Sequence, residues 1–540
     1  MNTHKFHLRL LLFAVMLSHW AVVKPEVVLP PLFADGMVLQ RGRELRVNGT
    51  AAPGEKVTLS MAGRKYTATA AASGRWSIVM PGMKAGGPYE MRINDVCLKD
   101  VMVGDVFLCA GQSNMELTVA RVMDRYAEEV EGYENTRVRY VKVPYAYRFD
   151  APADTLKKAR WQAMTADNVA GYSALCYFFG RLLQERTGVA VGIVNTSWGG
   201  TPVEAWMSGQ ALEDFPEYRS LMSIYADAEM TDAVIRGERM RQAAWTAETW
   251  RSDPGVNGRK KWYEADYDDT DWEKVDMFDS RWATRHGRAA NGTHWFRREI
   301  DVPAGCGAVE AVLRLGCMVD ADSVYVNGRL VGSTGYQYPP RIYKVPAGVL
   351  REGRNQITIR LFSYGGRPSF VKEKPYKLIC GGREISLEGE WKHRAGAQMP
   401  QWPSTTSLQN MPGGLFNGMV HPLRDYEFSG VVWYQGESNV GRWGEYAGLL
   451  GAMMKDWRKL FADDGLPFYI VELADFLAPD DPGRAAWAGL RKQQAMAAET
   501  DGNAVLIKNS DTGEWNDIHP LDKKTAAGRL VEAVMRRINN

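Results

Sequence analysis

Two residues that could together perform nucleophilic chemistry, Ser113 and His519, stand far apart in this 540-residue chain. Ser113 lies in the sequence Gly-Gln-Ser-Asn, between an apolar run typical of a strand and a segment typical of a helix start. A serine at such a turn is held at the carboxyl edge of a sheet, where the helix N-terminus favours developing negative charge. A serine there is more often only a helix cap, so this placement alone is a weak indication.

The histidine that could act as the base is found by elimination. Eight histidines occur, and three of them lie in or beside the N-terminal apolar segment. Three more lie in or next to a β-rich segment, and His421 comes before a strand, at the wrong end of the expected sheet. His519 follows the last expected strand and is therefore the preferred general base. The excluded residues are His4, His7, His19, His286, His294, His393 and His421.

Acyl transfer also needs donors for a tetrahedral oxyanion. Candidate donors are the backbone N–H of Ser113, the N–H of Gly199 or Gly200, and the side-chain amide of Asn439. Each of these could instead belong to an ordinary turn or loop cap. Together, each after a different strand, they favour an oxyanion site.

The alternation of expected strands and helices around these residues predicts an α/β domain, which would position them. Ser173 can cap a helix that runs through Thr187 and ends at Gly188. Parallel strands joined by right-handed crossovers predict a flavodoxin-like sheet whose polar loops meet at the carboxyl ends of the strands. The five expected strands are residues 105–109, 189–195, 430–434, 468–473 and 504–507.

The domain order expected along the chain has five parts. Residues 1–24 read as a signal peptide with an apolar core too short to span a bilayer. Residues 25–100 predict a small immunoglobulin-like β-sandwich, and residues 101–249 and 386–540 the two parts of the α/β domain. Residues 250–385 predict an inserted β domain, which we expect to be an independent module that shapes access to the site.

Composition narrows the class of protein. Lys and Arg number 66 against 64 Asp and Glu, so the chain lacks the excess positive charge expected of a nucleic-acid-binding protein. Since the only long apolar stretch is the N-terminal one, we expect an exported, periplasmic or extracellular protein with no membrane span. The sequence holds no metal-binding spacing of Cys and His. Cys109 and Cys176 read as buried free thiols, and one disulfide among Cys306, Cys317 and Cys380 is possible.

Several motifs resemble the sialate O-acetylesterases of the SGNH hydrolase superfamily. They are Leu-Phe-Ala-Asp-Gly-Met-Val-Leu-Gln at residues 32–40, Gly-Gln-Ser-Asn-Met at 111–115, Trp-Gly-Gly-Thr at 198–201, Trp-Tyr-Gln-Gly-Glu-Ser-Asn at 433–439 and Asp-Ile-His-Pro at 517–520. The insertion resembles the jelly-roll domains of β-galactosidase-type glycosidases, notably at residues 294–298 and 326–328.

The resemblance implies a serine esterase that needs no cofactor and removes O-acetyl groups from sialic acids on glycans. The candidate substrate contacts are side chains within these motifs, Gln112, Gln435 and Glu437, and Arg442 just past Asn439. A site arginine would suit the sialate carboxylate. Two alternatives remain open: an acetylesterase acting on another polysaccharide such as xylan or pectin, and an inactive carbohydrate-binding protein.

One departure from the superfamily concerns the group that orients His519. The usual last block is Asp-x-x-His, whereas Asn516 stands three residues before His519 and Asp517 stands two before. Asn516 carries no charge to stabilise an imidazolium. Asp517 is therefore the preferred third member of the catalytic set, with Asp511, Glu514 or a backbone carbonyl as alternatives.

Overall fold

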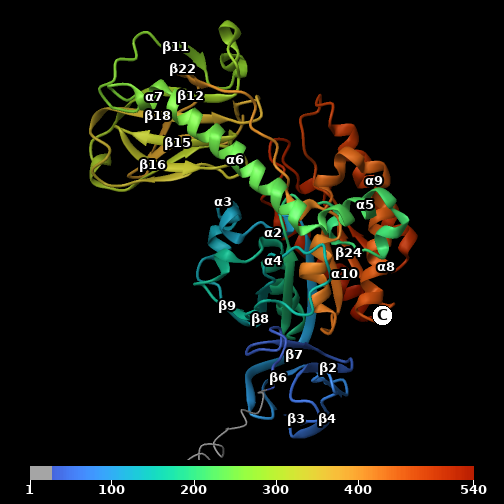
Figure 1. Ribbon diagram of the computed structural model, residues 1–540. Helices are drawn as coiled ribbons and strands as arrows, with labels where there is room; N and C mark the ends of the chain where they lie inside the picture. Colours follow the sequence, from blue (N-terminus) through green and yellow to red (C-terminus); the bar gives the residue numbers. More distant parts are fainter. Residues whose placement is uncertain (1–26, 540) are drawn as a thin grey trace, which may run out of the picture.

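The computed structural model describes residues 27–539, which form an N-terminal β region, an α/β region and a β region inserted into the latter (Figure 1). The signal peptide predicted at residues 1–24 lies outside the described residues. Within residues 27–539, no helix combines the length and the apolar character needed to cross a membrane.

The N-terminal β region is antiparallel apart from its first strand. β2 pairs with β5, and β3 pairs with β4 and β6. The predicted hairpin between β3 and β4 turns through Ala62 and Gly63, which both have positive φ, as a tight hairpin turn requires. The strands are β1 (Val38–Gln40), β2 (Leu45–Thr50), β3 (Lys56–Met61), β4 (Arg64–Thr69), β5 (Arg75–Met80) and β6 (Gly86–Ile93).

β7 (Val96–Gly111) joins the N-terminal region to the α/β region as one continuous strand. Its first half pairs with β6 in antiparallel fashion, and its second half pairs in parallel with β10 and β23. The boundary predicted between residues 100 and 101 therefore falls inside a strand. The change of sequence pattern there marks a change of partners, not a linker.

The α/β region is built on a sheet in the order β25-β24-β23-β7-β10-β8-β9. All neighbouring pairs except β8–β9 are parallel. Five strands lie where the sequence predicts them, but β8 was missed because charged residues alternate with its apolar ones. The bounds are β8 (Asn135–Lys142), β9 (Gln162–Met164), β10 (Val191–Ser197), β23 (Gly430–Tyr434), β24 (Phe468–Val471) and β25 (Ala504–Ile507).

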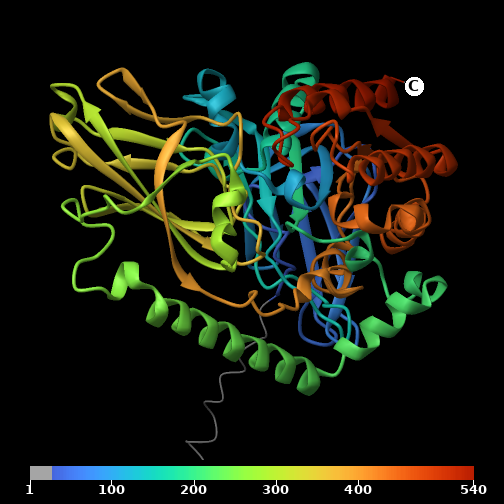
Figure 2. The same cartoon turned by 90° about the horizontal axis from the view of Figure 1, so that it is seen from above.

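Both predicted caps of the helix over residues 174–187 are confirmed. The Ser173 hydroxyl accepts from the N–H of Cys176 at the start of α4, and Gly188 ends α4 at φ +69°. The long helix α6 runs alongside both the α/β and the inserted region (Figure 2) and crosses the boundary predicted at 249/250. The helices are α2 (Ser113–Glu116), α3 (Val119–Val130), α4 (Ala174–Thr187), α5 (Pro216–Tyr225), α6 (Ala228–Ser252), α7 (Pro254–Asn257), α8 (Tyr446–Leu460), α9 (Arg484–Asp501) and α10 (Lys523–Asn539).

The inserted β region holds a six-stranded sheet, β11-β22-β12-β18-β15-β16, and a four-stranded sheet, β17-β13-β20-β21. Because β22 pairs with β11 and β12, the region ends later than the predicted residue 385. A disulfide joins Cys306 to Cys380, while Cys109 and Cys176 are buried thiols. The strands are β11 (Glu273–Asp276), β12 (Gly292–Val302), β13 (Ala311–Leu315), β14 (Met318–Val319), β15 (Ala321–Val326), β16 (Arg329–Thr334), β17 (Ile342–Val345), β18 (Gly353–Ser363), β19 (Ser369–Phe370), β20 (Tyr376–Cys380), β21 (Arg383–Ser386) and β22 (Glu390–Gln398).

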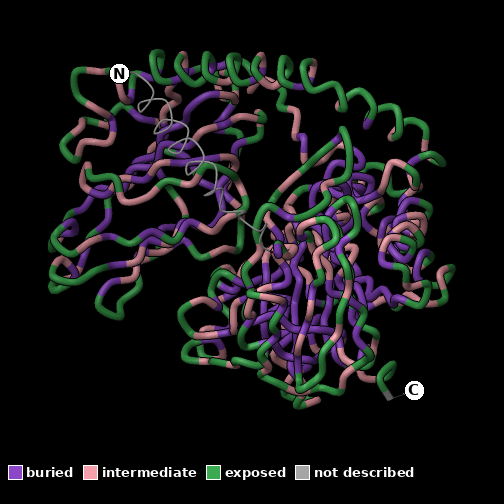
Figure 3. Tube along the Cα trace, turned by 60° about the horizontal axis from the view of Figure 1, so that its bottom comes forward, coloured by how far each residue is buried: buried purple, intermediate pink, exposed green. Residues whose placement is uncertain are grey.

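Buried residues gather in two main cores (Figure 3). One core is continuous through the N-terminal β region and the α/β region, so these two parts are packed as a single body. The other lies between the sheets of the inserted region. The inserted region therefore has its own hydrophobic core and meets the α/β region outside that core.

Candidate active site

Ser113 stands where β7 gives way to the short helix α2. Gly111, the last residue of β7, has φ +138°, and a Cβ on it would lie 2.1 Å from the carbonyl oxygen of Tyr434. Only glycine combines that φ with so close an approach. The N–H of Gln112 donates to the same carbonyl at 3.1 Å, and the chain then turns so that Ser113 opens α2.

His519 meets Ser113 across 406 residues of sequence. Its Nε2 lies 2.8 Å from Ser113 Oγ, a distance at which the hydroxyl donates to the imidazole. The loop between β25 and α10 carries this histidine to the carboxyl edge of the sheet. Burial lowers the pKa of His519 to about 3, and the nearby positive charges of Lys523 and Arg121 act in the same direction. The ring is therefore neutral at neutral pH, as a general base must be.

Asp517 lies beside His519 but does not form the hydrogen bond expected of an orienting carboxylate. Its Oδ1 accepts from the backbone N–H of His519 at 2.9 Å and is 4.0 Å from Nδ1. Among the described residues Nδ1 has no hydrogen-bond partner. Asp517 thus fixes the histidine through its backbone N–H, and its carboxylate makes no direct hydrogen bond to the ring.

The alternative orienting groups are engaged elsewhere. Asp511 pairs with Arg529 at 2.6 Å, and Glu514 accepts from Lys374 at 2.9 Å. The amide of Asn516 donates to the Lys372 carbonyl at 2.8 Å. Nδ1 also lacks a carbonyl partner in the described part of the chain, and of the candidate acids only Asp517 has an oxygen within 4.0 Å of an imidazole nitrogen.

The two glycines predicted as oxyanion donors differ in availability. The N–H of Gly199 donates to Glu116 Oε2 at 2.7 Å, so that carboxylate already uses it. Gly200 has φ +77° and lines the same cavity as Ser113. The N–H of Ser113 is the first of α2, where helix geometry leaves donors free. Ser113 and Gly200 are therefore the available backbone donors.

Asn439 does not occupy the predicted oxyanion position. Its side chain is completely buried, and its amide nitrogen donates to Glu204 Oε2 at 3.0 Å. Its oxygen accepts from the N–H of Val203 and from Gln435 Nε2. It is not among the residues that line the cavity around Ser113. Asn439 instead connects the loops after β10 and β23 by hydrogen bonds. Its sequence position after a strand is compatible with either this structural role or a catalytic one, so the sequence could not separate them.

Gln112 offers the side-chain donor that Asn439 does not. Its Oε1 accepts from Gln435 Nε2 at 3.1 Å and from the N–H of Ser438 at 3.2 Å, which fixes the amide orientation. Its Nε2 donates to no partner in the described part of the chain, and the residue lines the cavity directly beside Ser113. From its motif, Gln112 was predicted only as a substrate contact. Its place directly before Ser113 in the sequence is the signal for a role closer to the reaction.

The cavity around Ser113 and His519 has a volume of about 1320 Å³. It is large enough for more than one sugar ring and is lined by both polar and aromatic groups. Among residues 27–539, no three His, Cys, Asp or Glu side chains gather as metal ligands would. The lining residues are Gln112, Ser113, Glu116, Leu117, Thr118, Arg121, Tyr140, Lys142, Tyr145, Gly171, Trp198, Gly199, Gly200, Tyr336, Tyr338, Pro339, Ser407, Gln409, Glu437, Ser438, Ile518 and His519.

Of the other predicted substrate contacts, only Glu437 lines this cavity. Burial raises the pKa of its carboxyl group, which accepts from the Asn114 amide. Gln435 is fully buried, and its Nε2 donates a hydrogen bond to Oε1 of Gln112. Arg442 pairs with Glu204 at 2.6 Å and does not line the cavity, so its predicted role as a carboxylate ligand is not supported.

The inserted β region supplies residues that sequence analysis missed. The ring of Tyr338, in the loop between β16 and β17, lies perpendicular to the His519 ring with centroids 5.1 Å apart. Lys374, between β19 and β20, donates to both Glu514 and Asp517. Neither residue stands in a recognisable motif, and only the packing of the two regions brings them to the site.

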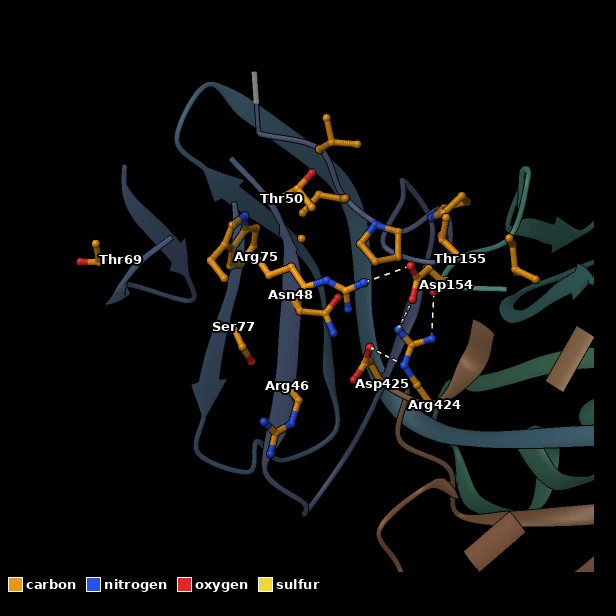
Figure 4. A pocket seen from close by; sticks show the side chains of 17 residues that line it. Arg46, Asn48, Thr50, Thr69, Arg75, Ser77, Asp154, Thr155, Arg424 and Asp425 are labelled. Carbon is orange, nitrogen blue, oxygen red and sulfur yellow. Dashed lines mark hydrogen bonds and ion pairs between the residues drawn. The ribbon is translucent and has the colours of Figure 1, made fainter. Parts of the chain in front are cut away.

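A second hollow, of about 660 Å³, lies between the N-terminal β region and the α/β region (Figure 4). Asp154 pairs there with Arg75 at 3.0 Å and with Arg424 at 3.4 Å, which links three segments of the chain. No histidine lines this hollow. It therefore has no base for a hydrolytic serine, and the reactive site is the cavity at Ser113.

Family comparison agrees with this geometry. The model described as carbohydrate esterase, sialic acid-specific acetylesterase, matches residues 103–238 and 393–530, just over half of the chain. The model of the β-galactosidase second all-β domain matches residues 257–366, within the inserted region. The family match therefore covers both parts of the α/β region and includes Ser113 and His519.

Similar proteins point the same way. A sialate O-acetylesterase from Homo sapiens is 33% identical over 186 residues, and one from Rattus norvegicus is 34% identical over 199 residues. These alignments cover 31% and 33% of this chain, and the chain spans about a third of the length of these curated relatives (35% and 36%). A carbohydrate acetylesterase from Xanthomonas citri shares the fold, with a TM-score of 0.56 and 24% identity over 95% of this chain and 75% of that one.

Proposed function

Because the chain belongs to the sialic acid-specific acetylesterase family of carbohydrate esterases, we propose that it is a carboxylic ester hydrolase that removes O-acetyl groups from sugars, with sialic acids as its substrates. The observation that carries the proposal is the contact of 2.8 Å between Ser113 Oγ and His519 Nε2 inside a large cavity. Such a pair activates a serine for acyl transfer.

The reaction proceeds in two steps. Ser113 Oγ attacks the acetyl carbonyl while its proton passes to His519 Nε2, and the tetrahedral oxyanion accepts hydrogen bonds from Ser113 N–H, Gly200 N–H and Gln112 Nε2. The bond between the carbonyl carbon and the sugar oxygen then breaks, and His519 gives its proton to that oxygen, which leaves as the sugar hydroxyl. Water, deprotonated by the same histidine, attacks the acetyl-serine; the bond from the acetyl carbon to Ser113 Oγ breaks, His519 returns the proton to Oγ, and acetate leaves.

The nearby charge of Asp517 stabilises the imidazolium that forms in each step. This contribution matters because burial otherwise disfavours the charged ring, as its lowered pKa shows. Lys374 neutralises part of that carboxylate and holds it in place. The site can therefore work with Ser113 and His519 in direct contact and with Asp517 as an electrostatic partner.

Two finer statements on the fold belong to this proposal. We infer that the α/β region is a flavodoxin-like SGNH hydrolase core, which the parallel order of its strands and the meeting of Ser113 and His519 at one sheet edge support. We infer that the inserted region is a jelly roll, which its two antiparallel sheets and the β-galactosidase match support.

Acetate release tests the proposal directly. The wild-type protein and Ser113→Ala should be compared on O-acetylated sialic acids, acetylxylan, acetylated pectin and 4-nitrophenyl acetate. We expect the wild type to release acetate fastest from the sialic acids and Ser113→Ala to release none. Release from xylan or pectin alone would overturn the substrate, and equal traces from both proteins on every ester would overturn the activity.

We also propose that the protein is exported. The apolar segment at residues 10–17 and the disulfide between Cys306 and Cys380 support this location. Sequencing the N-terminus of protein recovered outside the cytoplasm should find the first 20 to 25 residues removed, at about the position expected for signal cleavage. An intact chain that begins at Met1 and stays in the cytoplasm would contradict export.

A further inference from the structure

Arg121 is the one basic side chain lining the active-site cavity that has no carboxylate partner among the described residues. We propose that Arg121 binds a carboxylate of the substrate and so makes the enzyme selective for acetylated sugars that carry an acid group. This inference rests on the proposed esterase function and identifies the residue that would select its substrate class.

The other charges of the cavity wall are compensated by the protein. Lys142 Nζ donates to Asn195 and Ser197 at 2.9 Å and pairs with Glu116 at 3.2 Å. The carboxyl group of Glu437 accepts from Asn114, and burial raises its pKa, which favours its neutral form. Lys142 and Glu437 thus each have partners within the protein, which leaves the guanidinium of Arg121 as the cation available to a ligand.

Nothing in the fold requires a cation at position 121. The residue lies in the first turn of α3, where the helix dipole disfavours positive charge. Its Nη2 donates once, to the Tyr338 carbonyl at 3.3 Å, and its buried Nε has no partner among residues 27–539. An arginine with donors to spare presents the planar fork that suits a carboxylate.

The position of Arg121 fits a substrate held at Ser113. Arg121 and His519 line the same cavity, and the charge of Arg121 helps to lower the pKa of His519. Tyr338, whose carbonyl receives the Arg121 hydrogen bond, packs its ring against His519. A single sugar could therefore place its carboxylate at Arg121 and an acetyl ester at Ser113.

The sharpest test varies only the substrate charge. The probes are an O-acetylated N-acetylneuraminic acid and its C1 carboxamide, which has the same shape but no charge. A charge-assisted hydrogen bond contributes about 1.5–3 kcal/mol, so Arg121→Gln should lower kcat/KM for the acid roughly 10- to 100-fold. Turnover of the carboxamide should change by less than about twofold, and Arg121→Lys should restore part of the preference.

The matched control is Arg125→Gln, one turn further along α3, where Arg125 pairs with Asp522 at 3.0 Å and does not line the cavity. It should keep the wild-type ratio between acid and carboxamide. Equal losses of Arg121→Gln on both probes, or a wild type that does not distinguish them, would overturn the inference.

A binding measurement separates this inference from the proposed activity. Calorimetry with Ser113→Ala protein should show tighter binding of N-acetylneuraminic acid than of its carboxamide, and the double variant Ser113→Ala, Arg121→Gln should lose that difference. This outcome would support Arg121 even if the wild type released no acetate. The same affinity for both probes in Ser113→Ala would overturn the role of Arg121 whatever the activity.

Discussion

The ammonium group of Lys374 lies 3.2 Å from the carboxylate of Asp517, so a side chain of the inserted β region holds the loop that carries His519. The same loop is attached to this region through Trp515 Nε1, which donates to Glu373 at 2.8 Å. The independence of the insertion as a module stays a prediction, because these contacts do not show whether the region folds alone. It has its own core, but it also supports the catalytic histidine and supplies Tyr338 to the cavity wall.

Replacing Lys374 should show this support in the rate. Lys374→Ala frees Asp517 and Glu514 from their shared partner and lets the loop shift, and a misplacement of about 1 Å at a catalytic group can cost about 100-fold. We expect kcat on 4-nitrophenyl acetate to fall roughly 10- to 100-fold with little change in KM. Lys377→Ala is the control, because Lys377 pairs with Glu384 inside the inserted region. Similar rates for both variants would remove Lys374 from the positioning of the site.

Ser113→Ala should abolish turnover and leave the fold intact. The hydroxyl is the nucleophile, and loss of a triad serine costs several orders of magnitude, about 10⁶-fold where it has been measured. Ester hydrolysis and Tm should be measured on the same preparation. A variant that retains more than a few per cent of wild-type turnover would show that another group attacks the ester.

Gln112→Ala should lower the rate of hydrolysis, whereas Asn439→Ala should lower the stability of the fold. Loss of one oxyanion donor lowers kcat roughly 10²–10³-fold with little effect on KM, and we expect this of Gln112→Ala. Asn439→Ala leaves buried Glu204 without one of its donors, which costs about 1–3 kcal/mol in the free energy of unfolding. Chemical unfolding and initial rates distinguish the two. A loss of kcat without a loss of stability in Asn439→Ala, together with a loss of stability alone in Gln112→Ala, would assign the oxyanion donor to Asn439.

Asp517→Asn tests whether the carboxylate acts on the imidazole by its charge. The amide can still accept the hydrogen bond from the His519 N–H, but it cannot stabilise an imidazolium. We expect kcat to fall about 10²- to 10⁴-fold, the range known for a triad acid. Asp511→Asn should be nearly neutral, because Asp511 is exposed and paired with Arg529. Near-normal turnover with an unchanged Tm in Asp517→Asn would leave a Ser–His dyad.

The pH dependence should reflect the buried state of His519. Its lowered pKa keeps the ring neutral, so the acid limb of kcat/KM should lie below about pH 6.5, the ordinary histidine value. The unfolded chain binds a proton below that pH while the folded protein does not. The contribution of neutral His519 to the free energy of unfolding is therefore fully present above about pH 6.5. It is lost as the pH falls toward the pKa of His519 in the folded protein.

A Tm series between pH 7 and pH 4 checks the stability effect. His519→Gln should lose less stability on acidification than the wild type, since it lacks one group that must stay neutral in the fold. Burial lowers the pKa of His294 to about 4 in the same direction, so part of the acid sensitivity should remain in this variant. Identical acid sensitivity of the two proteins would contradict the assignment of a buried neutral His519.

The sequence by itself determined most of the helices and strands of the α/β region and the edge of the sheet at which the reactive side chains meet. Continuous apolar runs predicted β7, β10, β23 and β25. Because each strand is followed by a polar loop, Ser113 after β7 and His519 after β25 could be assigned to one edge of a parallel sheet. The helix caps at Ser173 and Gly188 were equally local and equally readable. Such signals depend on spacing within a few residues, and tertiary contacts do not alter them here.

Only the tertiary structure decided which partner each group meets. The N–H of Gly199 is taken by Glu116 and the amide of Asn439 by Glu204, although their sequence positions suggested free donors. Arg121 and Lys374 reach the site from segments that carry no motif. The physical reason is that a hydrogen bond or ion pair between distant segments depends on side-chain packing to within an ångström, and a one-dimensional pattern does not contain that distance.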